Sequence, residues 1–165
     1  MNQLELRENM TAADFGSGSG GWAIPLAKKL VSGRVYAVDI QEEALAALRT
    51  KADSLKLNNI KSIRADLEQS LGSSIQSGLL DLVLLTNLLF QVKHRQEILS
   101  EAKRALRPGG RLLLVDWRPE ALVGPTEGRI PLTEAKEMVQ GAGFEFEKEV
   151  SAGAYHYGLV FLKAS

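Results

Sequence analysis

The sequence predicts an α/β fold, in which helices cover both faces of a doubly wound parallel sheet. Three observations predict it. Short apolar, β-rich runs alternate with amphipathic runs along most of the 165 residues, as in a series of strand–helix–strand units. A glycine-rich turn follows the first of these runs, and the last two β-rich runs lie close enough together to form a hairpin.

In the first third of the chain, two predicted strands alternate with two predicted helices. Residues 11–15 form a short buried strand that ends at glycines, and residues 22–31 form a helix that tolerates Pro25 because it lies near the first turn. Residues 34–40 are β-rich. Residues 42–55 are helical, because acidic residues occupy the first turn and apolar side chains recur on one face. That face carries Leu45, Leu48, Ala52 and Leu55.

The middle of the chain continues the alternation. Residues 60–65 predict a third strand, and the strongly apolar residues 79–85 predict a central strand that is buried on both faces. Residues 96–106 form a helix that stops at Pro108-Gly109-Gly110. Residues 111–117 form a fifth strand.

The last part of the chain predicts a loop, a helix and a hairpin. Residues 121–131 contain glycine and two prolines and predict a loop. Thr133 is expected to cap a helix that ends at Gly143. The strands 144–150 and 155–162 are expected to pair, which adds one antiparallel strand to the sheet.

The composition fits one soluble domain, residues 1–165, with residues 1–10 as a short polar lead-in. The formal net charge is zero, so strong attraction to nucleic acid or anionic lipid is not expected. Without cysteine the chain has no disulfide or thiolate chemistry, and its two histidines lack the spacing of a metal motif. With no recognisable signal peptide or membrane-spanning run, the expected location is the cytoplasm.

A glycine-rich loop, Asp14–Gly21, joins the first predicted strand to the first helix. Glycines let the backbone turn sharply and let a ligand approach it closely. Gly16, Gly18 and Gly21 match the dinucleotide-binding fingerprint, whereas Gly16, Gly18 and Gly20 match the loop of methyltransferases. An ordinary strand–helix junction without a ligand is the third interpretation.

Carboxylates end the next two strands. Asp39 ends the second strand about 20 residues after the glycine loop, where a carboxylate can accept hydrogen bonds from both hydroxyls of a ribose. Asp66 follows the third strand and can accept the amino group of an adenine, with Leu67 against the ring. The alternative for each aspartate is that it caps the segment that follows.

Polar or glycine residues thus cluster at the carboxyl ends of all five parallel strands. The fourth strand ends in Thr86-Asn87-Leu88-Leu89-Phe90 and the fifth in Val115-Asp116-Trp117. In open α/β sheets, ligands bind at this edge. The joint placement of these residues therefore predicts a ligand site there.

These segments resemble the class I S-adenosylmethionine-dependent methyltransferase family over nearly the whole chain. DFGSGSG, VYAVDI, RADLE and DLVLLTNLLFQV are similar to the family's first four motifs, and LRPGGRLLLVDW resembles the segment that enters its fifth strand. Within the family the sequence is most similar to the small branch of ubiquinone/menaquinone-biosynthesis-type enzymes. The resemblance implies a Rossmann-like sheet of seven strands in the order 3-2-1-4-5-7-6, with strand 7 antiparallel, and S-adenosylmethionine as the cofactor.

The resemblance also implies a cofactor site. The glycine loop would hold the methionine part, Asp39 the ribose, and Asp66 with Leu67 the adenine, while Asn87 and Leu88 would lie near the sulfonium. The full set of expected cofactor-binding residues is Asp14, Gly16, Ser17, Gly18, Gly20, Asp39, Ile40, Asp66, Leu67, Asn87 and Leu88.

Two features depart from the family. Relatives usually carry a longer N-terminal segment that helps to cover the substrate, so the active site here is expected to be open, completed by a partner subunit, or covered by the loop after Trp117. The Asn/Asp-Pro-Pro-Tyr/Phe signature of many nucleic-acid amino methyltransferases is replaced by Thr86-Asn87-Leu88-Leu89, which disfavours methylation of a base.

The expected reaction is an in-line displacement, in which a nucleophile on the acceptor attacks the activated methyl group and S-adenosylhomocysteine leaves. The protein supplies alignment and a dry pocket. If a base is needed, the candidates are Asp116, His94 and, third, His156, although a plain surface histidine is the favoured interpretation of His94. Candidate residues lining the acceptor pocket are Phe90, Trp117, Arg118 and Tyr155.

The acceptor is expected to be a small molecule; a protein side chain stays open, nucleic acid is disfavoured, and the oligomeric state is unknown. Two other functions compete. An NAD-binding oxidoreductase shares the glycine loop and Asp39, but it explains neither Asp66 nor the closing hairpin. A cofactor-binding module that is inactive, or that needs a partner, would bind the cofactor without turnover.

Overall fold

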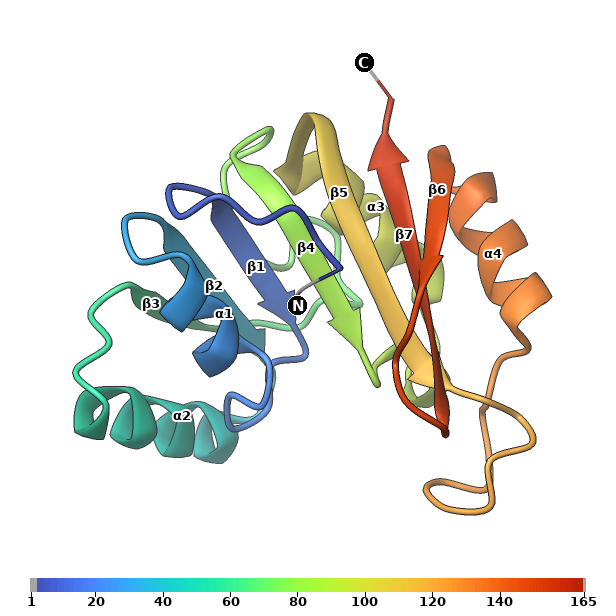
Figure 1. Cartoon of the computed structure of the whole chain (residues 1–165), viewed down its shortest axis with the longest axis horizontal. Helices are drawn as coiled ribbons and strands as arrows, with labels where there is room; N and C mark the ends of the chain where they lie inside the picture. Colours follow the sequence, from blue (N-terminus) through green and yellow to red (C-terminus); the bar gives the residue numbers. More distant parts are fainter. Residues whose placement is uncertain (1–2, 165) are drawn as a thin grey trace.

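The computed structural model describes residues 3–164, which form one seven-stranded sheet in the order β3-β2-β1-β4-β5-β7-β6 (Figure 1). Strands β1 to β5 run parallel to one another, and β7 is antiparallel to both β5 and β6. The predicted sheet is confirmed, including its strand order. The elements are β1 (Thr11–Phe15), α1 (Ala23–Lys29), β2 (Arg34–Asp39), α2 (Glu42–Ser54), β3 (Ile60–Arg64), β4 (Leu80–Thr86), η1 (Leu89–Gln91), α3 (Arg95–Ala105), β5 (Leu106–Trp117), α4 (Leu132–Gly141), β6 (Phe144–Val150) and β7 (His156–Lys163).

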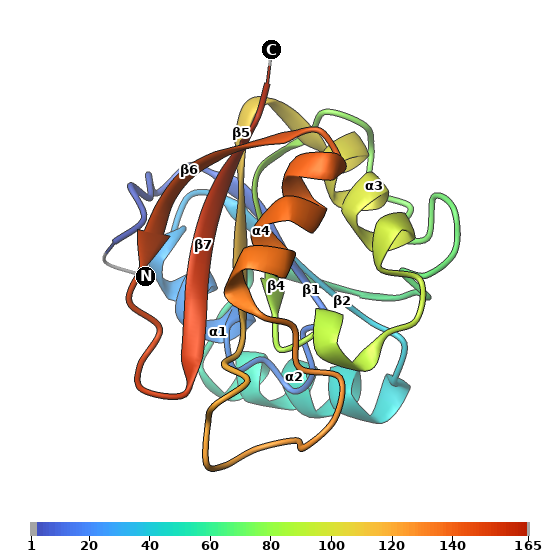
Figure 2. The same cartoon turned by 90° about the vertical axis from the view of Figure 1, so that its right-hand side faces the viewer.

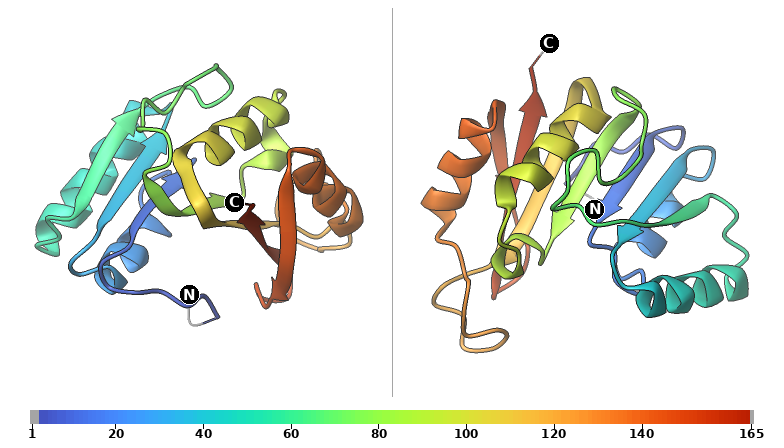
Figure 3. Two further views of the ribbon diagram at one scale, coloured as in Figure 1. Left: turned by 90° about the horizontal axis from the view of Figure 1, so that it is seen from above. Right: turned by 180° about the vertical axis from the view of Figure 1, so that it is seen from behind.

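Two apolar layers, one on each face, hold the sheet together. Helices α3 and α4 bury residues such as Ile98 and Val139 against one face, while α1 and α2 bury Leu26 and Leu48 against the other. The N-terminal segment also covers this second face through the buried Leu4, so it lies on the side of the sheet opposite α3 (Figure 3). Both faces of the central strands are therefore dry, as their continuous apolar sequences predict.

Most element boundaries lie within one or two residues of the predictions, and two differences have a clear local cause. Strand β5 already begins at Leu106, which pairs with Leu80, so Pro108-Gly109-Gly110 lies within an irregular start of the strand. Helix α4 begins at Leu132 after Pro131, and no side chain caps it. The prediction that Thr133 is the N-cap is therefore wrong, because Pro131 occupies the N-cap position two residues earlier.

The parallel strands all end at one edge of the sheet, where the glycine loop, the residues after β3 and the segment 87–94 meet. The segment 118–131 between β5 and α4 extends beyond this edge beside the turn of the β6–β7 hairpin (Figure 2). Within the described part of the chain, none of the helices has the length and apolar character needed to cross a membrane.

Candidate active site

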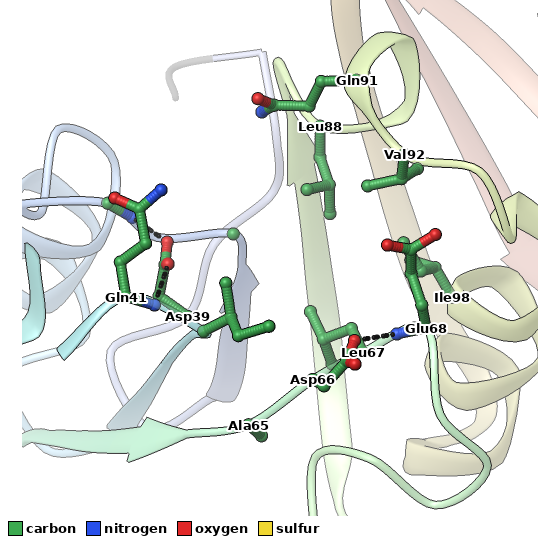
Figure 4. A pocket seen from close by; sticks show the side chains of 13 residues that line it. Asp39, Gln41, Ala65, Asp66, Leu67, Glu68, Leu88, Gln91, Val92 and Ile98 are labelled. Carbon is green, nitrogen blue, oxygen red and sulfur yellow. Dashed lines mark hydrogen bonds between the residues drawn. The ribbon is translucent and has the colours of Figure 1, made fainter.

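A cavity of about 390 Å³ lies at the carboxyl edge of β1 to β4 (Figure 4). Residues from four strand ends form its walls, which fits the predicted convergence. Asp39 and Gln41 approach from one side, and Leu88 and Gln91 approach from the opposite side. The complete lining is Gly16, Gly18, Asp39, Ile40, Gln41, Ala65, Asp66, Leu67, Glu68, Leu88, Gln91, Val92 and Ile98.

Asp39 is held at the end of β2 by two backbone amides. Its Oδ2 accepts the N–H of Gly18 at 2.8 Å, and its Oδ1 accepts the N–H of Gln41 at 2.9 Å. Gly18 has a φ of 51°, a conformation that glycine adopts without strain. These bonds orient the carboxylate and leave lone pairs on both oxygens for hydroxyl donors.

Asp66 and Leu67 occupy the turn that follows β3. Asp66 Oδ1 accepts the N–H of Glu68 at 2.9 Å, which fixes the turn. No helix begins here, so the aspartate caps a turn instead of the helix considered in one interpretation. Leu67 is buried and lines the cavity beside Ile98, so an apolar wall adjoins the carboxylate.

Asp14 lies directly beneath the glycine loop and carries an uncompensated carboxylate. Among residues 3–164, neither of its oxygens has a hydrogen-bond partner of good geometry. Burial raises the pKa of Asp14, the nearby amide of Ala23 opposes this shift, and the charge of Asp39 adds to it, so that the pKa is about 7 in all. The buried hydroxyl of Ser17 is also unpartnered within the described chain. A ligand carrying cationic or donor groups would satisfy this part of the edge.

The backbone turns sharply after β4. Asn87 has a φ of 52°, and its N–H donates to the carbonyl of Val115 at 2.8 Å. Its buried side-chain oxygen has no partner within residues 3–164. Leu88 points into the cavity against Gly16, where an added Cβ would lie 2.9 Å from a leucine methyl group. Asn87 itself, like Asp14, Ser17 and Gly20, is not part of the cavity lining.

None of the three candidate bases lines this cavity. Asp116 is fully buried, and its carboxylate accepts the N–H of Trp117 at 2.8 Å and the N–H of Phe90 at 3.3 Å. Burial raises the pKa of Asp116. His94 is exposed at the start of α3, where its N–H donates to Glu68. Asp116 is therefore built to hold the end of β5 against η1.

A second cavity of about 540 Å³ adjoins the first through Gln91, which lines both. Its lining is Phe90, Gln91, Pro125, Thr126, Glu127 and Gly128. Of the residues expected to line an acceptor pocket, Phe90 lines this cavity, and Trp117, Arg118 and Tyr155 do not.

Those three residues surround the base of the segment 118–131 instead. The ring centroids of Trp117 and His156 lie 4.1 Å apart, and the Arg118 Nε–H donates to the carbonyl of His156 at 2.9 Å. Tyr155 is exposed. Burial lowers the pKa of His156. The sequence analysis missed Gln91, Glu68 and Arg129, whose contacts join segments about 10 to 25 residues apart and leave no local pattern.

Comparisons with known proteins agree with this architecture. The family model described as a methyltransferase domain matches residues 6–151. A structure described as that of an S-adenosylmethionine-dependent methyltransferase from Aquifex aeolicus superposes with a TM-score of 0.90 at 25% identity, covering 99% of this chain and 87% of that one. The chain belongs to the class I S-adenosylmethionine-dependent methyltransferases, near their menaquinone-type branch.

Two curated relatives are longer. A demethylmenaquinone methyltransferase from Bacillus mycoides is 24% identical over 131 residues, covering 79% of this chain and 54% of the relative. An uncharacterized 37.1 kDa protein in transposon TN4556 of Streptomyces fradiae is 30% identical over 120 residues, covering 71% of this chain and 33% of the relative. The chain thus spans about half or less of these two proteins.

The family's cofactor is S-adenosylmethionine, and the residues at the edge fit its chemistry. Asp39 offers free lone pairs at one end of the cavity, and Asp66 and Leu67 place a carboxylate beside an apolar wall. The carboxylate of Asp14, which has no hydrogen-bond partner among residues 3–164, lies where a cation would be stabilised.

Proposed function

We propose that this chain transfers the methyl group of S-adenosylmethionine to a small-molecule acceptor. The observation that carries the proposal is that Gln91 lines both the cavity at the ends of β1 to β4 and a second cavity. One cavity suits the cofactor and the other the acceptor, so both reactants would meet at the end of β4.

Each half of the adenosyl group has a partner in the proposed complex. Asp39 accepts hydrogen bonds from the ribose hydroxyls, while its bonds to the N–H groups of Gly18 and Gln41 keep it oriented. Asp66 accepts the adenine amino group, and Leu67 packs against the ring, with Ile40 at the rim of the cavity.

The methionine half lies along the glycine loop in the proposed complex. Asp14 stabilises its ammonium group, and Gly16, Gly18 and Gly20, with Ser17, let the backbone approach it. Asn87 and Leu88 adjoin the sulfonium. The bound cofactor supplies an activated methyl group; the protein aligns the acceptor with it and excludes water, which is the main protein contribution to such a transfer.

No proton acceptor on the protein is required by the proposal. Asp116 is committed to the N–H groups of Trp117 and Phe90, and His94 is exposed and lines neither cavity. An acceptor that is a good nucleophile when bound needs only alignment. The curated relatives named demethylmenaquinone methyltransferases support an acceptor of small-molecule size.

Calorimetric titration of the purified chain with S-adenosylhomocysteine, and in parallel with NAD, tests the cofactor assignment. We expect micromolar binding of the first and none of the second. Transfer is then assayed with a labelled methyl donor and a panel containing 1,4-dihydroxynaphthalene, a simple amine and a simple thiol. Binding without turnover of any acceptor would favour a module that needs a partner, and binding of NAD alone would overturn the proposal.

A further inference from the structure

The segment 118–131 is organised around one side chain. It contains no helix or strand, yet five of its backbone carbonyls converge on the guanidinium of Arg129. The two N–H groups of Nη1 are shared among the carbonyls of Ala121 at 2.6 Å, Pro119 at 3.0 Å and Arg118 at 3.4 Å. Nη2 donates to Val123 at 2.7 Å, and Nε donates to Pro125.

The planar guanidinium is suited to this arrangement. It presents five N–H donors in a fixed fork and stays charged at all relevant pH values. Carbonyl dipoles that point at one another repel, so a cation at their centre stabilises a closed loop that has little backbone hydrogen bonding of its own. Lysine carries the same charge but only three donors on one nitrogen, and therefore cannot reach all five carbonyls.

The closed loop rests on the site at two points. At Gly124 an added Cβ would lie 2.5 Å from the Trp117 ring, so the backbone packs directly on the indole. At Gly128 an added Cβ would lie 2.1 Å from the carbonyl oxygen of Phe90. Arg129 itself lies 5.9 Å from the centre of the Trp117 ring. The loop is thus seated on β5 and on η1 at once.

We propose that Arg129 is the positioning residue for the acceptor: it fixes the wall Pro125–Gly128 opposite Phe90 and Gln91. The proposal rests on the proposed function, which assigns that cavity to the acceptor. Arg129 acts through the loop, since the cavity lining contains Pro125, Thr126, Glu127 and Gly128 but not Arg129.

This role makes a selective prediction, because only Gln91 is shared between the two cavities. Loss of Arg129 should release the loop from Trp117 and enlarge the acceptor cavity. The cavity at the ends of β1 to β4 should keep its shape. A residue that merely supported the fold would affect both cavities and the free energy of unfolding together.

The test compares Arg129→Ala and Arg129→Lys with Arg34→Ala, which removes an exposed arginine at the start of β2. All variants carry Trp22→Phe, so that Trp117 is the sole tryptophan. The readouts are acrylamide quenching of Trp117, thermolysin cleavage near the exposed Leu122, binding of S-adenosylhomocysteine, and KM and kcat for whichever panel acceptor is methylated.

For Arg129→Ala we expect quenching to rise about threefold, cleavage to accelerate about tenfold, and affinity for S-adenosylhomocysteine to change by less than about twofold. KM for the acceptor should rise by about tenfold. Arg129→Lys should recover part of each effect, and Arg34→Ala should match the parent. Quenching and cleavage that stay at parental values in Arg129→Ala would overturn the proposal.

Two outcomes separate this proposal from the proposed function. If the parent chain methylates none of the acceptors, the proposed function fails, while quenching and cleavage still decide whether Arg129 closes the loop. If Arg129→Ala does not fold, Arg129→Lys carries the test. Loss of S-adenosylhomocysteine binding in both variants would overturn the proposal, because Arg129 would then support the whole fold and not one wall.

Discussion

The two cavities that meet at Gln91 owe their shapes to different kinds of sequence information. The cavity at the ends of β1 to β4 is lined by residues at or within a few positions of a strand end, such as Asp39 and Asp66. The cavity beside it depends on a segment without regular structure, closed by the side chain of Arg129. The shape of the first cavity, the proposed cofactor half of the site, is therefore specified by residues near strand ends. The shape of the second cavity, the proposed acceptor half, depends on the side chain of Arg129.

This difference has a physical consequence for robustness. Strand ends are fixed by the sheet, whose core includes completely buried residues such as Val83 and Leu85, so side chains there keep their positions when one neighbour is changed. The segment 118–131 places only Ile130 in that core and contains no helix or strand, so we expect it to open at a lower free energy than the strand ends. We infer that changes in the cofactor half act on affinity one contact at a time, whereas changes in the acceptor half act on a whole wall.

The largest expected effect is that of Asp39→Ala in the cofactor half. The substitution removes the acceptor of the ribose hydroxyls and also frees the N–H groups of Gly18 and Gln41. Because hydrogen bonds to a charged group contribute about 1.5–3 kcal/mol each, affinity for S-adenosylhomocysteine should fall about 30-fold or more. Calorimetric titration measures the loss.

The matched control for this prediction is Glu43→Ala, which removes an exposed carboxylate in the first turn of α2. Its affinity should stay within about twofold of the wild type. Far-ultraviolet circular dichroism checks that both variants retain the fold. Equal affinity in Asp39→Ala and Glu43→Ala would remove Asp39 from the proposed ribose site.

Asp14 provides a pH-dependent contrast within the same half. Burial raises its pKa from 3.8 to about 7, so between these values the folded chain holds a proton that the unfolded chain has released. The free energy of unfolding therefore falls as pH rises through this window. In Asp14→Asn this contribution is absent, so its stability relative to the wild type should increase by about 2–3 kcal/mol from pH 5 to pH 8.

Urea unfolding at the two pH values measures this difference, and a constant difference would show that Asp14 ionises normally. The cofactor adds a second readout. A bound ammonium group would favour the ionised carboxylate, so wild-type affinity for S-adenosylhomocysteine should rise from pH 6 to pH 8. The same titration of Asp14→Asn should show little change with pH.

The contrast between the halves also explains what the sequence predicts. The strand order and the convergence of Gly16, Gly18, Asp39, Asp66 and Leu88 on one cavity were predictable, because each residue lies at or just beyond a strand end. Parallel strands bring such positions to one edge whatever the details of packing. That these residues bind the cofactor stays a prediction.

The acceptor half was less predictable, because its contacts depend on how a loop folds back. Trp117 was expected to line a pocket, but the loop packs on its ring at Gly124. Arg129 carried no signal, since its partners are backbone carbonyls with no residue preference. Asp116 lies at the end of the fifth strand as expected, yet its carboxylate binds two backbone amides.

Asp116→Asn tests the link between the halves and should have a smaller effect. Asparagine keeps one acceptor oxygen, so one of the bonds to Trp117 and Phe90 is lost, with an expected decrease in the free energy of unfolding of about 1–2 kcal/mol. Turnover should persist at a reduced level. Turnover abolished at unchanged stability would instead identify Asp116 as a general base. Asp53→Asn, at an exposed position of α2, is the control.

The smallest expected effect concerns Glu68, which joins two walls of the cofactor cavity. Its Oε1 accepts the N–H groups of Lys93 at 2.8 Å and His94 at 2.7 Å, and thereby ties the turn after β3 to the start of α3. These bonds lie near solvent, where each contributes about 0.5–1.5 kcal/mol. Glu68→Ala should therefore weaken S-adenosylhomocysteine binding by about threefold to tenfold.

Glu68→Gln retains an oxygen acceptor and should recover most of this affinity, because the proposed role needs a hydrogen-bond acceptor and not a charge. Glu145→Ala, at an exposed position of β6, supplies the control for loss of a surface carboxylate. If Glu68→Gln binds as weakly as Glu68→Ala, the charge of Glu68 matters in itself. The shape and affinity of the cofactor half would then also depend on long-range electrostatics. The cofactor half and the acceptor half would in that case differ less in how the sequence specifies them.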